Sequence, residues 1–215
     1  MNAIIFDMDG TLIDTERVSQ LSWRRAAAEL GADVPERIWD AFVGCSMRDA
    51  HDLMLAELKD RGLTDAMFAR RRELFNEVCE QELTLKPGAL ETLHALRDAG
   101  YTLALATSTE EAHAIPTLEK FGLFDCFDER VYGDHVEHAK PAPDIYLLAA
   151  ERLGRAPRDC CAVEDSPNGV RSAHGAGMPI FMVPDHTAPT QEIRSMCAGV
   201  LETLFELPGA LKGLE

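Results

Sequence analysis

Five short runs of apolar residues recur along the chain, and polar or glycine-containing segments separate them. Continuous apolar runs of this length are typical of strands that are buried on both faces of a parallel sheet. The runs span residues 3–6, 102–106, 131–132 (the weakest), 161–163 and 180–183. We therefore expect these segments to form parallel strands.

Helical patterns lie between the later runs. The segments 87–99, 143–153 and 167–176 each begin at a proline and are followed by a glycine, the usual order at the two ends of a helix. A fourth helix is expected around residues 112–121, where Pro116 marks either the first turn or a kink. Strands that alternate with helices predict an α/β fold with a doubly wound, mostly parallel, Rossmann-like sheet.

One long segment interrupts this alternation. Residues 15–83 have apolar residues at helical spacing, for example Trp23, Ala26 and Leu30, and contain no convincing strand. The segment is too long for a connection and long enough for a small helical bundle. We expect an α-helical cap domain at 15–83, inserted into a catalytic core domain formed by residues 1–14 and 84–215.

Composition and charge narrow the possible partners. The 215 residues include 21 Lys plus Arg and 37 Asp plus Glu, which gives a formal net charge of −16. This charge argues against a nucleic-acid partner and against an anionic membrane surface, because both are polyanions. We expect a monomer or weak dimer that acts on a small molecule, and an anionic substrate would need local positive charge at its site.

The sequence also indicates the cellular compartment of the protein. No window approaches the roughly 20 apolar residues of a membrane span, and the first residues lack the basic stretch of a signal peptide. Without a secretory signal or a C-x-x-C pair, we expect the cysteines to be reduced thiols. They are Cys45, Cys79, Cys126, Cys160, Cys161 and Cys197. These features predict a cytoplasmic protein.

Acidic residues follow two of the predicted strands, at the edge where open α/β sheets bind their ligands. Asp7 and Asp9 follow the first strand and can face the same side, because side chains alternate along a strand. Glu164 and Asp165 follow the fourth. Carboxylates gathered at one edge repel one another unless a cation lies among them or some are protonated. Oxygen ligands without His or Cys suit a hard ion, which predicts a magnesium site.

Phosphate-binding groups follow other strands of the same sheet. Thr107 and Ser108 follow the second strand and offer hydroxyl donors, and Lys140 lies in the segment after the third and offers a compact positive charge. A carboxylate beside magnesium can attack phosphorus directly. A second carboxyl two residues further on can protonate the leaving oxygen and later activate water.

In this order and at this spacing, the motifs resemble those of the haloacid dehalogenase superfamily. They resemble most closely the phosphatase and β-phosphoglucomutase branch, in which a helical cap follows the first motif. The residues that carry the resemblance are Asp7-Met8-Asp9-Gly10-Thr11, Thr107-Ser108, Lys140-Pro141-Ala142-Pro143-Asp144 and Val163-Glu164-Asp165-Ser166-Pro167-Asn168-Gly169.

The resemblance implies a role for each site residue. It implies that Asp7 is the nucleophile and a metal ligand, and that Asp9 is the general acid/base and gives its backbone carbonyl to the metal. It further implies that Asp165 binds magnesium, with Glu164 as a direct ligand or a neighbour of one. Finally, it implies that Thr107 and Lys140 hold the transferring phosphoryl group while Ser108 donates nearby.

Two positions distinguish members of this branch. Counted from the first motif, Ser19 stands where the sugar-phosphate mutase has a histidine at the cap edge, so water becomes the expected acceptor. The cap loop Gly44-Cys45-Ser46-Met47-Arg48 is partly similar to the mutase loop. Its Arg48 lies one place later than the mutase arginine and is a candidate for substrate contact as well as for exposed surface.

Other interpretations of the motifs fit less well. A calcium-binding EF-hand loop would need an acid or Asn where Thr11 stands and a Glu where Val18 stands. A zinc site at His135 and His138 lacks the H-E-x-x-H pattern. A phospho-accepting receiver has no long helical insert and lacks the acid at Asp9, and a catalytically idle binding module would not need the full acid set.

The expected function is therefore that of a magnesium-dependent phosphatase. It would hydrolyse a small phosphorylated metabolite, such as a sugar phosphate, through an aspartyl-phosphate intermediate. A hexose-phosphate mutase similar to β-phosphoglucomutase is the alternative.

Overall fold

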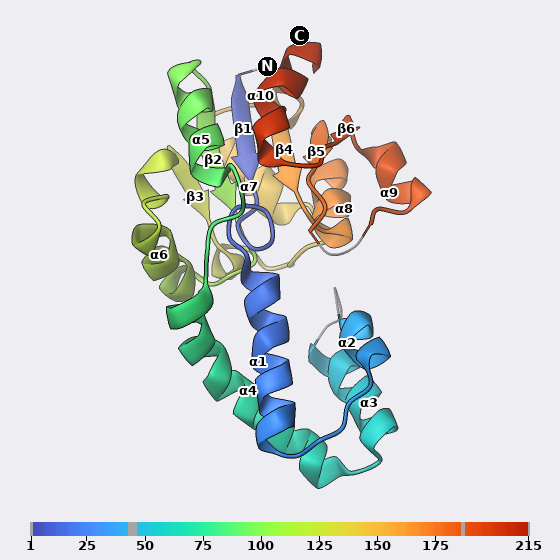
Figure 1. Ribbon diagram of the computed structural model, residues 1–215. Coiled ribbons are helices and arrows are strands. Elements are labelled where there is room, and N and C mark those ends of the chain that lie inside the picture. Colours follow the sequence, from blue (N-terminus) through green and yellow to red (C-terminus); the bar gives the residue numbers. More distant parts are fainter. Residues whose placement is uncertain (1, 43–46, 186–187, 215) are drawn as a thin grey trace. The chain divides into compact units, whose positions relative to one another are not determined.

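A computed structural model describes residues 2–42, 47–185 and 188–214. Its strands form one sheet in the order β3-β2-β1-β4-β5-β6, and every neighbouring pair is parallel (Figure 1). The strands are β1 (Ala3–Phe6), β2 (Thr102–Ala106), β3 (Glu129–Val131), β4 (Cys160–Glu164), β5 (Ile180–Met182) and β6 (Gly199–Val200). The parallel α/β sheet is confirmed, while β6 was not predicted, because a two-residue strand at the sheet edge carries no apolar run.

The four helices expected after the insertion are present, with their ends shifted by a few residues, and two short helices that were not predicted follow them. Pro116 lies inside its helix rather than in the first turn. The expected helices are α5 (Ala89–Asp98), α6 (Glu111–Lys120), α7 (Asp144–Arg152) and α8 (Pro167–Gly175), and the two that were not predicted are α9 (Gln191–Met196) and α10 (Leu207–Leu211). Ser166 begins α8 as its N-cap, since its hydroxyl accepts the backbone N–H of Gly169 at 3.1 Å.

The chain divides into two compact units. The core unit consists of Met1–Ile13 and Leu85–Glu215 and contains the sheet. The helical unit is Asp14–Thr84, inserted after β1. That this unit caps the substrate stays a prediction.

The helical unit contains α1 (Thr15–Glu29), α2 (Glu36–Phe42), α3 (Met47–Leu58) and α4 (Arg61–Glu82). Its core is aromatic and sulfur-rich: the Trp23 ring meets Phe42 and Phe68 edge-on, with centroids 5.2 and 4.6 Å away. Met54 and Met67 are fully buried beside them. The residues Gly44, Cys45 and Ser46 of the expected cap loop lie outside the described residues.

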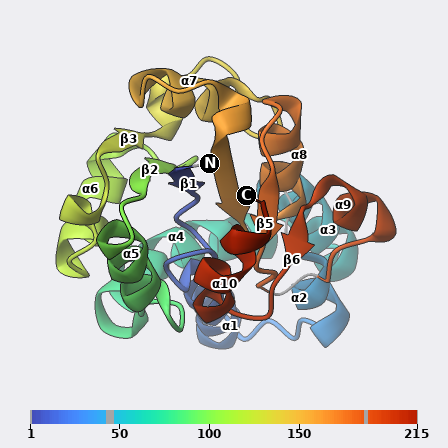
Figure 2. The ribbon, with the colours of Figure 1, turned by 90° about the horizontal axis from the view of Figure 1, so that it is seen from above.

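The two faces of the sheet are covered by different helices (Figure 2). Ala3 and Ile5 of β1 pack in one buried cluster with residues of α7 and α8. Side chains alternate along a strand, so Asp7 continues this same face beyond the end of β1. Among the described residues, no helix is long and apolar enough to cross a membrane.

Candidate active site

Asp7 and Glu164 lie side by side at the carboxyl ends of β1 and β4. The pairing of Phe6 with Val163 sets this register, and the Asp7 backbone N–H donates to the Val163 carbonyl at 3.0 Å. In the next strand, the pairing of Phe6 with Leu105 places Ala106 at the same level. Sheet register alone therefore brings residues from three separate motif regions together.

Lys140 connects these three strands. Its Nζ lies 2.6 Å from Asp7 Oδ1, 2.7 Å from Glu164 Oε1 and 3.0 Å from the Ala106 carbonyl oxygen. An ammonium group has three donors, so each is used within the protein. The Lys140 side chain is only 7% exposed. It therefore acts as a fixed positive charge between two buried carboxylates.

Glu164 is fully buried and hydrogen-bonded on both carboxylate oxygens. Oε1 accepts from Lys140 and from the Tyr146 hydroxyl at 2.8 Å. Oε2 accepts from the Ser166 hydroxyl at 3.1 Å and from the backbone N–H groups of Asp165 and Ser166 at 3.2 and 3.3 Å. These contacts hold the carboxylate in one orientation.

The Asp9 carboxylate is held by two hydroxyl groups. Its Oδ2 accepts from Thr109 at 2.7 Å and from Thr107 at 3.1 Å. Thr107 is fully buried, and its Oγ1 also accepts the Thr109 backbone N–H at 3.0 Å. Thr107 therefore orients Asp9 here, and its contact with a phosphoryl group stays a prediction. Sequence reasoning missed Thr109, although residues two apart after a strand can face the same side.

Asp165 lies against the turn of the first motif. The Thr11 hydroxyl donates to its Oδ1 at 3.3 Å. Gly10 has φ +84°, and a β-carbon there would lie 2.3 Å from Asp165 Oδ2. Only glycine allows both this left-handed backbone and this close approach. The Gly of the D-x-D-G-T motif thus makes room for a carboxylate from another strand.

The acidic cluster has the character of a divalent metal site. One carboxylate oxygen each from Asp7, Glu164 and Asp165 lies within 4.8 Å of the others. Burial raises the pKa of Asp7 to about 7 against the opposing effect of Lys140, and Glu164 and Asp9 raise it further. Burial and the neighbouring carboxylates also raise the pKa of Asp165. A bound cation would relieve both penalties, so these oxygen donors fit a hard divalent ion.

A cavity of about 210 Å³ opens onto these side chains. It is lined by Asp7, Asp9, Ser108, Lys140, Asp165, Ser166 and Asn168. Ser108 is exposed at this cavity, and its carbonyl oxygen lies 2.1 Å from where a β-carbon on Gly133 would be. Gly133 therefore lets the loop after β3 pass close to the end of β2. The structure thus brings together all the predicted residues of the core unit.

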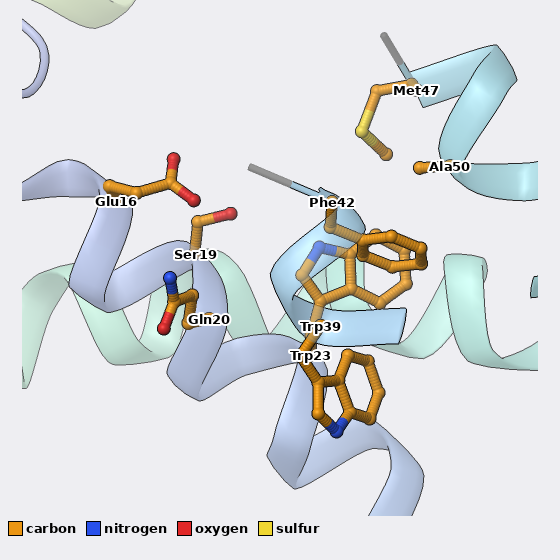
Figure 3. A pocket seen from close by; sticks show the side chains of 8 residues that line it. All are labelled: Glu16, Ser19, Gln20, Trp23, Trp39, Phe42, Met47 and Ala50. Atoms are coloured by element: carbon orange, nitrogen blue, oxygen red, sulfur yellow. The ribbon is translucent and has the colours of Figure 1, made fainter. Parts of the chain in front are cut away.

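The helical unit has a pocket of its own, of about 230 Å³. Figure 3 shows polar side chains from α1 along one part of it and the rings of Trp39 and Phe42 from α2 along another. The polar residues are Glu16, Ser19 and Gln20. Arg48, the remaining predicted substrate contact, is exposed in the first turn of α3, and its role stays a prediction.

Comparisons with known proteins agree with this geometry. The family model of haloacid dehalogenase-like hydrolases matches residues 1–177. The chain belongs to this family. As a haloacid dehalogenase-like hydrolase it has phosphatase relatives, and the resemblance expected from the motifs is confirmed.

Three relatives illustrate the similarity. This hydrolase is 35% identical to a phosphorylated carbohydrates phosphatase of Thermotoga maritima over 178 residues, 83% of this chain and 82% of the relative. It is 34% identical to the fructose-1-phosphate phosphatase YqaB of Escherichia coli over 179 residues, 81% of this chain and 92% of the relative. A crystal structure of a family hydrolase from Deinococcus radiodurans, with bound phosphate and sodium, superposes with a TM-score of 0.83 at 28% identity, covering 98% of this chain and 95% of that one.

Proposed function

We propose that this hydrolase is a magnesium-dependent phosphatase that cleaves a small phosphorylated metabolite, such as a sugar phosphate, through an aspartyl-phosphate on Asp7. One observation carries the proposal: Asp7 and Asp9 line one cavity, with Asp7 beside a buried ammonium and Asp9 held by two hydroxyls. The first carboxylate is thereby placed as a nucleophile, and the second as an acid/base.

The reaction proceeds in two steps. The Asp7 carboxylate attacks phosphorus, the bond between phosphorus and the ester oxygen breaks, and Asp9 gives its proton to the leaving oxygen. Asp9 then takes a proton from water, the water oxygen attacks phosphorus, and the bond to Asp7 breaks to release inorganic phosphate. Lys140 keeps its positive charge beside Asp7 in both steps, which stabilises the developing negative charge.

The metal-binding residues in this proposal are Asp7 and Asp165, together with the backbone carbonyl of Asp9. A magnesium ion bound there would neutralise charge on the phosphoryl oxygens. Glu164 orients its neighbours instead, because both of its oxygens already accept hydrogen bonds from the protein.

The relatives support a small phosphorylated substrate. Two of them are phosphatases of phosphorylated carbohydrates and of fructose 1-phosphate, and a third binds phosphate. The pocket of the helical unit has side chains of the kinds that bind carbohydrates. Glu16, Ser19 and Gln20 can bond hydroxyl groups, and the indole of Trp39 offers an apolar surface to C–H groups.

A phosphate-release screen tests the proposal. The chain is assayed with a panel of phosphorylated metabolites, with and without magnesium. We expect magnesium-dependent release from at least one small phosphate ester, and a loss of about a thousandfold or more in Asp7→Asn. Turnover near the parent rate in Asp7→Asn would show that Asp7 is not the nucleophile.

A hexose-phosphate mutase remains the second candidate, because the same aspartyl-phosphate would serve both reactions. Ser19 is the feature against it, since a serine hydroxyl is a poorer base than the histidine that the mutase has there. A coupled assay that compares isomerised sugar phosphate with free phosphate separates the two. Isomerisation that exceeds phosphate release would favour the mutase.

A further inference from the structure

We propose that Tyr146 is a positioning residue of this active site: its hydroxyl fixes the Glu164 carboxylate, which in turn holds the Lys140 ammonium against Asp7. No motif of the sequence analysis includes Tyr146. The inference rests on the proposed function only for the effect on turnover. The positioning of Lys140 by Tyr146 and Glu164 is a set of contacts within the protein and does not depend on which reaction is catalysed.

The contacts form a continuous chain from helix α7 to the nucleophile. The Tyr146 hydroxyl donates to Glu164 Oε1 at 2.8 Å, and Lys140 Nζ donates to the same oxygen at 2.7 Å. The same ammonium lies 2.6 Å from Asp7 Oδ1. Glu164 Oε1 is therefore shared between a phenol that does not touch Asp7 and an ammonium that does.

The ring of Tyr146 contributes a second contact. Lys140 Nζ lies 5.0 Å from the centre of the ring, within the range of a cation–π interaction. Tyr146 and Glu164 are both fully buried, and Lys140 nearly so. The tyrosine thus bounds the ammonium on one side through its ring and orients its carboxylate partner through its hydroxyl.

The hydroxyl explains why a tyrosine stands here rather than a phenylalanine. A buried hydroxyl is costly unless it makes a hydrogen bond. Its partner is a carboxylate oxygen, and hydrogen bonds to charged groups are stronger than those between neutral groups. Without the hydroxyl, Oε1 would keep only Lys140, and the ammonium could follow the carboxylate away from Asp7.

The hydrogen bond between Tyr146 and Glu164 also allows the positioning of Lys140 to be tested separately from metal binding. Tyr146 donates to Oε1, while the other oxygen of Glu164 accepts from the Ser166 hydroxyl and from two backbone N–H groups. Loss of the Tyr146 hydroxyl therefore acts on Lys140 and its contact with Asp7 Oδ1, while Asp165 keeps its contact to Thr11 and both proposed metal ligands keep their carboxylates. Turnover and metal affinity should respond differently.

The experiment compares Tyr146→Phe, which keeps the ring, with Tyr101→Phe, which removes the same hydroxyl just before β2, at the opposite end of the strand from the site. We expect kcat of Tyr146→Phe to fall about tenfold while the magnesium Kd, measured by calorimetry with the metal alone, stays within about threefold of the parent value. Tyr101→Phe should change neither. An unchanged kcat, or a magnesium Kd that rises in step with the loss of turnover, would contradict the proposal.

A second measurement does not depend on catalysis. The hydrogen exchange of the Lys140 ammonium, assigned by its loss in Lys140→Met, is followed by ¹H–¹⁵N NMR. We expect exchange to be about tenfold faster in Tyr146→Phe than in the parent and Tyr101→Phe proteins. An unchanged exchange rate would overturn the positioning role even if no phosphatase activity were found. Conversely, faster exchange in a chain that releases no phosphate would leave the positioning intact and reject the proposed function.

A double-mutant cycle tests the route through Glu164. In a Glu164→Gln background, Tyr146→Phe should lower kcat by less than about twofold, because the carboxylate through which it acts is already gone. Equal losses in the two backgrounds would show that Tyr146 acts by another route.

Discussion

A β-carbon added to Gly169 would lie 1.8 Å from the carboxyl carbon of Glu164. Helix α8 therefore comes this close to the end of β4 only because residue 169 has no side chain. The buried carboxylate fills the space that any larger residue would need. The glycine is thus part of what holds Glu164, and through it Lys140, in place.

Gly169→Ala is expected to lower the free energy of unfolding by about 2–4 kcal/mol. Within a helix this change ordinarily stabilises by up to about 1 kcal/mol. Here the new methyl group displaces a buried carboxylate from its hydrogen bonds, which costs more than the helix gains. Urea unfolding of the metal-free protein measures the difference.

Gly175→Ala, in the same helix, is the matched control. The nearest atom to a β-carbon there is Pro143 Cβ at 3.5 Å, an ordinary contact. We expect the stability of this variant to equal or exceed that of the parent protein. Equal stability of both alanine variants would mean that the site around Glu164 can relax freely.

Thr109→Val is expected to lower kcat about tenfold with little change in stability. The Thr109 hydroxyl lies 2.7 Å from Asp9 Oδ2 and is the shorter of the two hydroxyl contacts that orient this carboxylate. Steady-state kinetics checks the effect. Thr117→Val removes a hydroxyl that donates to the carbonyl of His113 within α6, and it should leave kcat unchanged. If Thr109→Val turned over as fast as this control, Asp9 would not depend on Thr109.

Magnesium is expected to stabilise the protein, because it would bind carboxylates that are buried close together. At about 100 times the Kd, a ligand that binds only the folded state adds about 2.7 kcal/mol to the free energy of unfolding. Thermal unfolding with and without magnesium measures this gain.

Asp165→Asn should abolish most of that gain, since it removes one proposed ligand. Asp159→Asn changes an exposed acid in the turn before β4 and serves as the control, in which the full gain should remain. A full magnesium response in Asp165→Asn would place the metal elsewhere.

The sequence by itself determined much of the core fold and the edge at which the chemistry lies. The apolar runs at Ala3–Phe6 and Thr102–Ala106 coincide with β1 and β2, because a strand buried on both faces needs a continuous apolar run. The order of the motifs placed Asp7, Lys140 and Glu164 after the first, third and fourth parallel strands, whose carboxyl ends share one edge. The helical insertion followed from its length and periodicity.

Only the tertiary structure decided which side chain meets which. Residue spacing fixes the face toward which Asp7 and Glu164 point, but their contact through Lys140 depends on the register between strands. The same holds for Thr109 at Asp9 and for Tyr146 at Glu164. Local periodicity specifies the direction of a side chain relative to its own backbone, whereas its partner is set by how closely a distant helix or strand can pack.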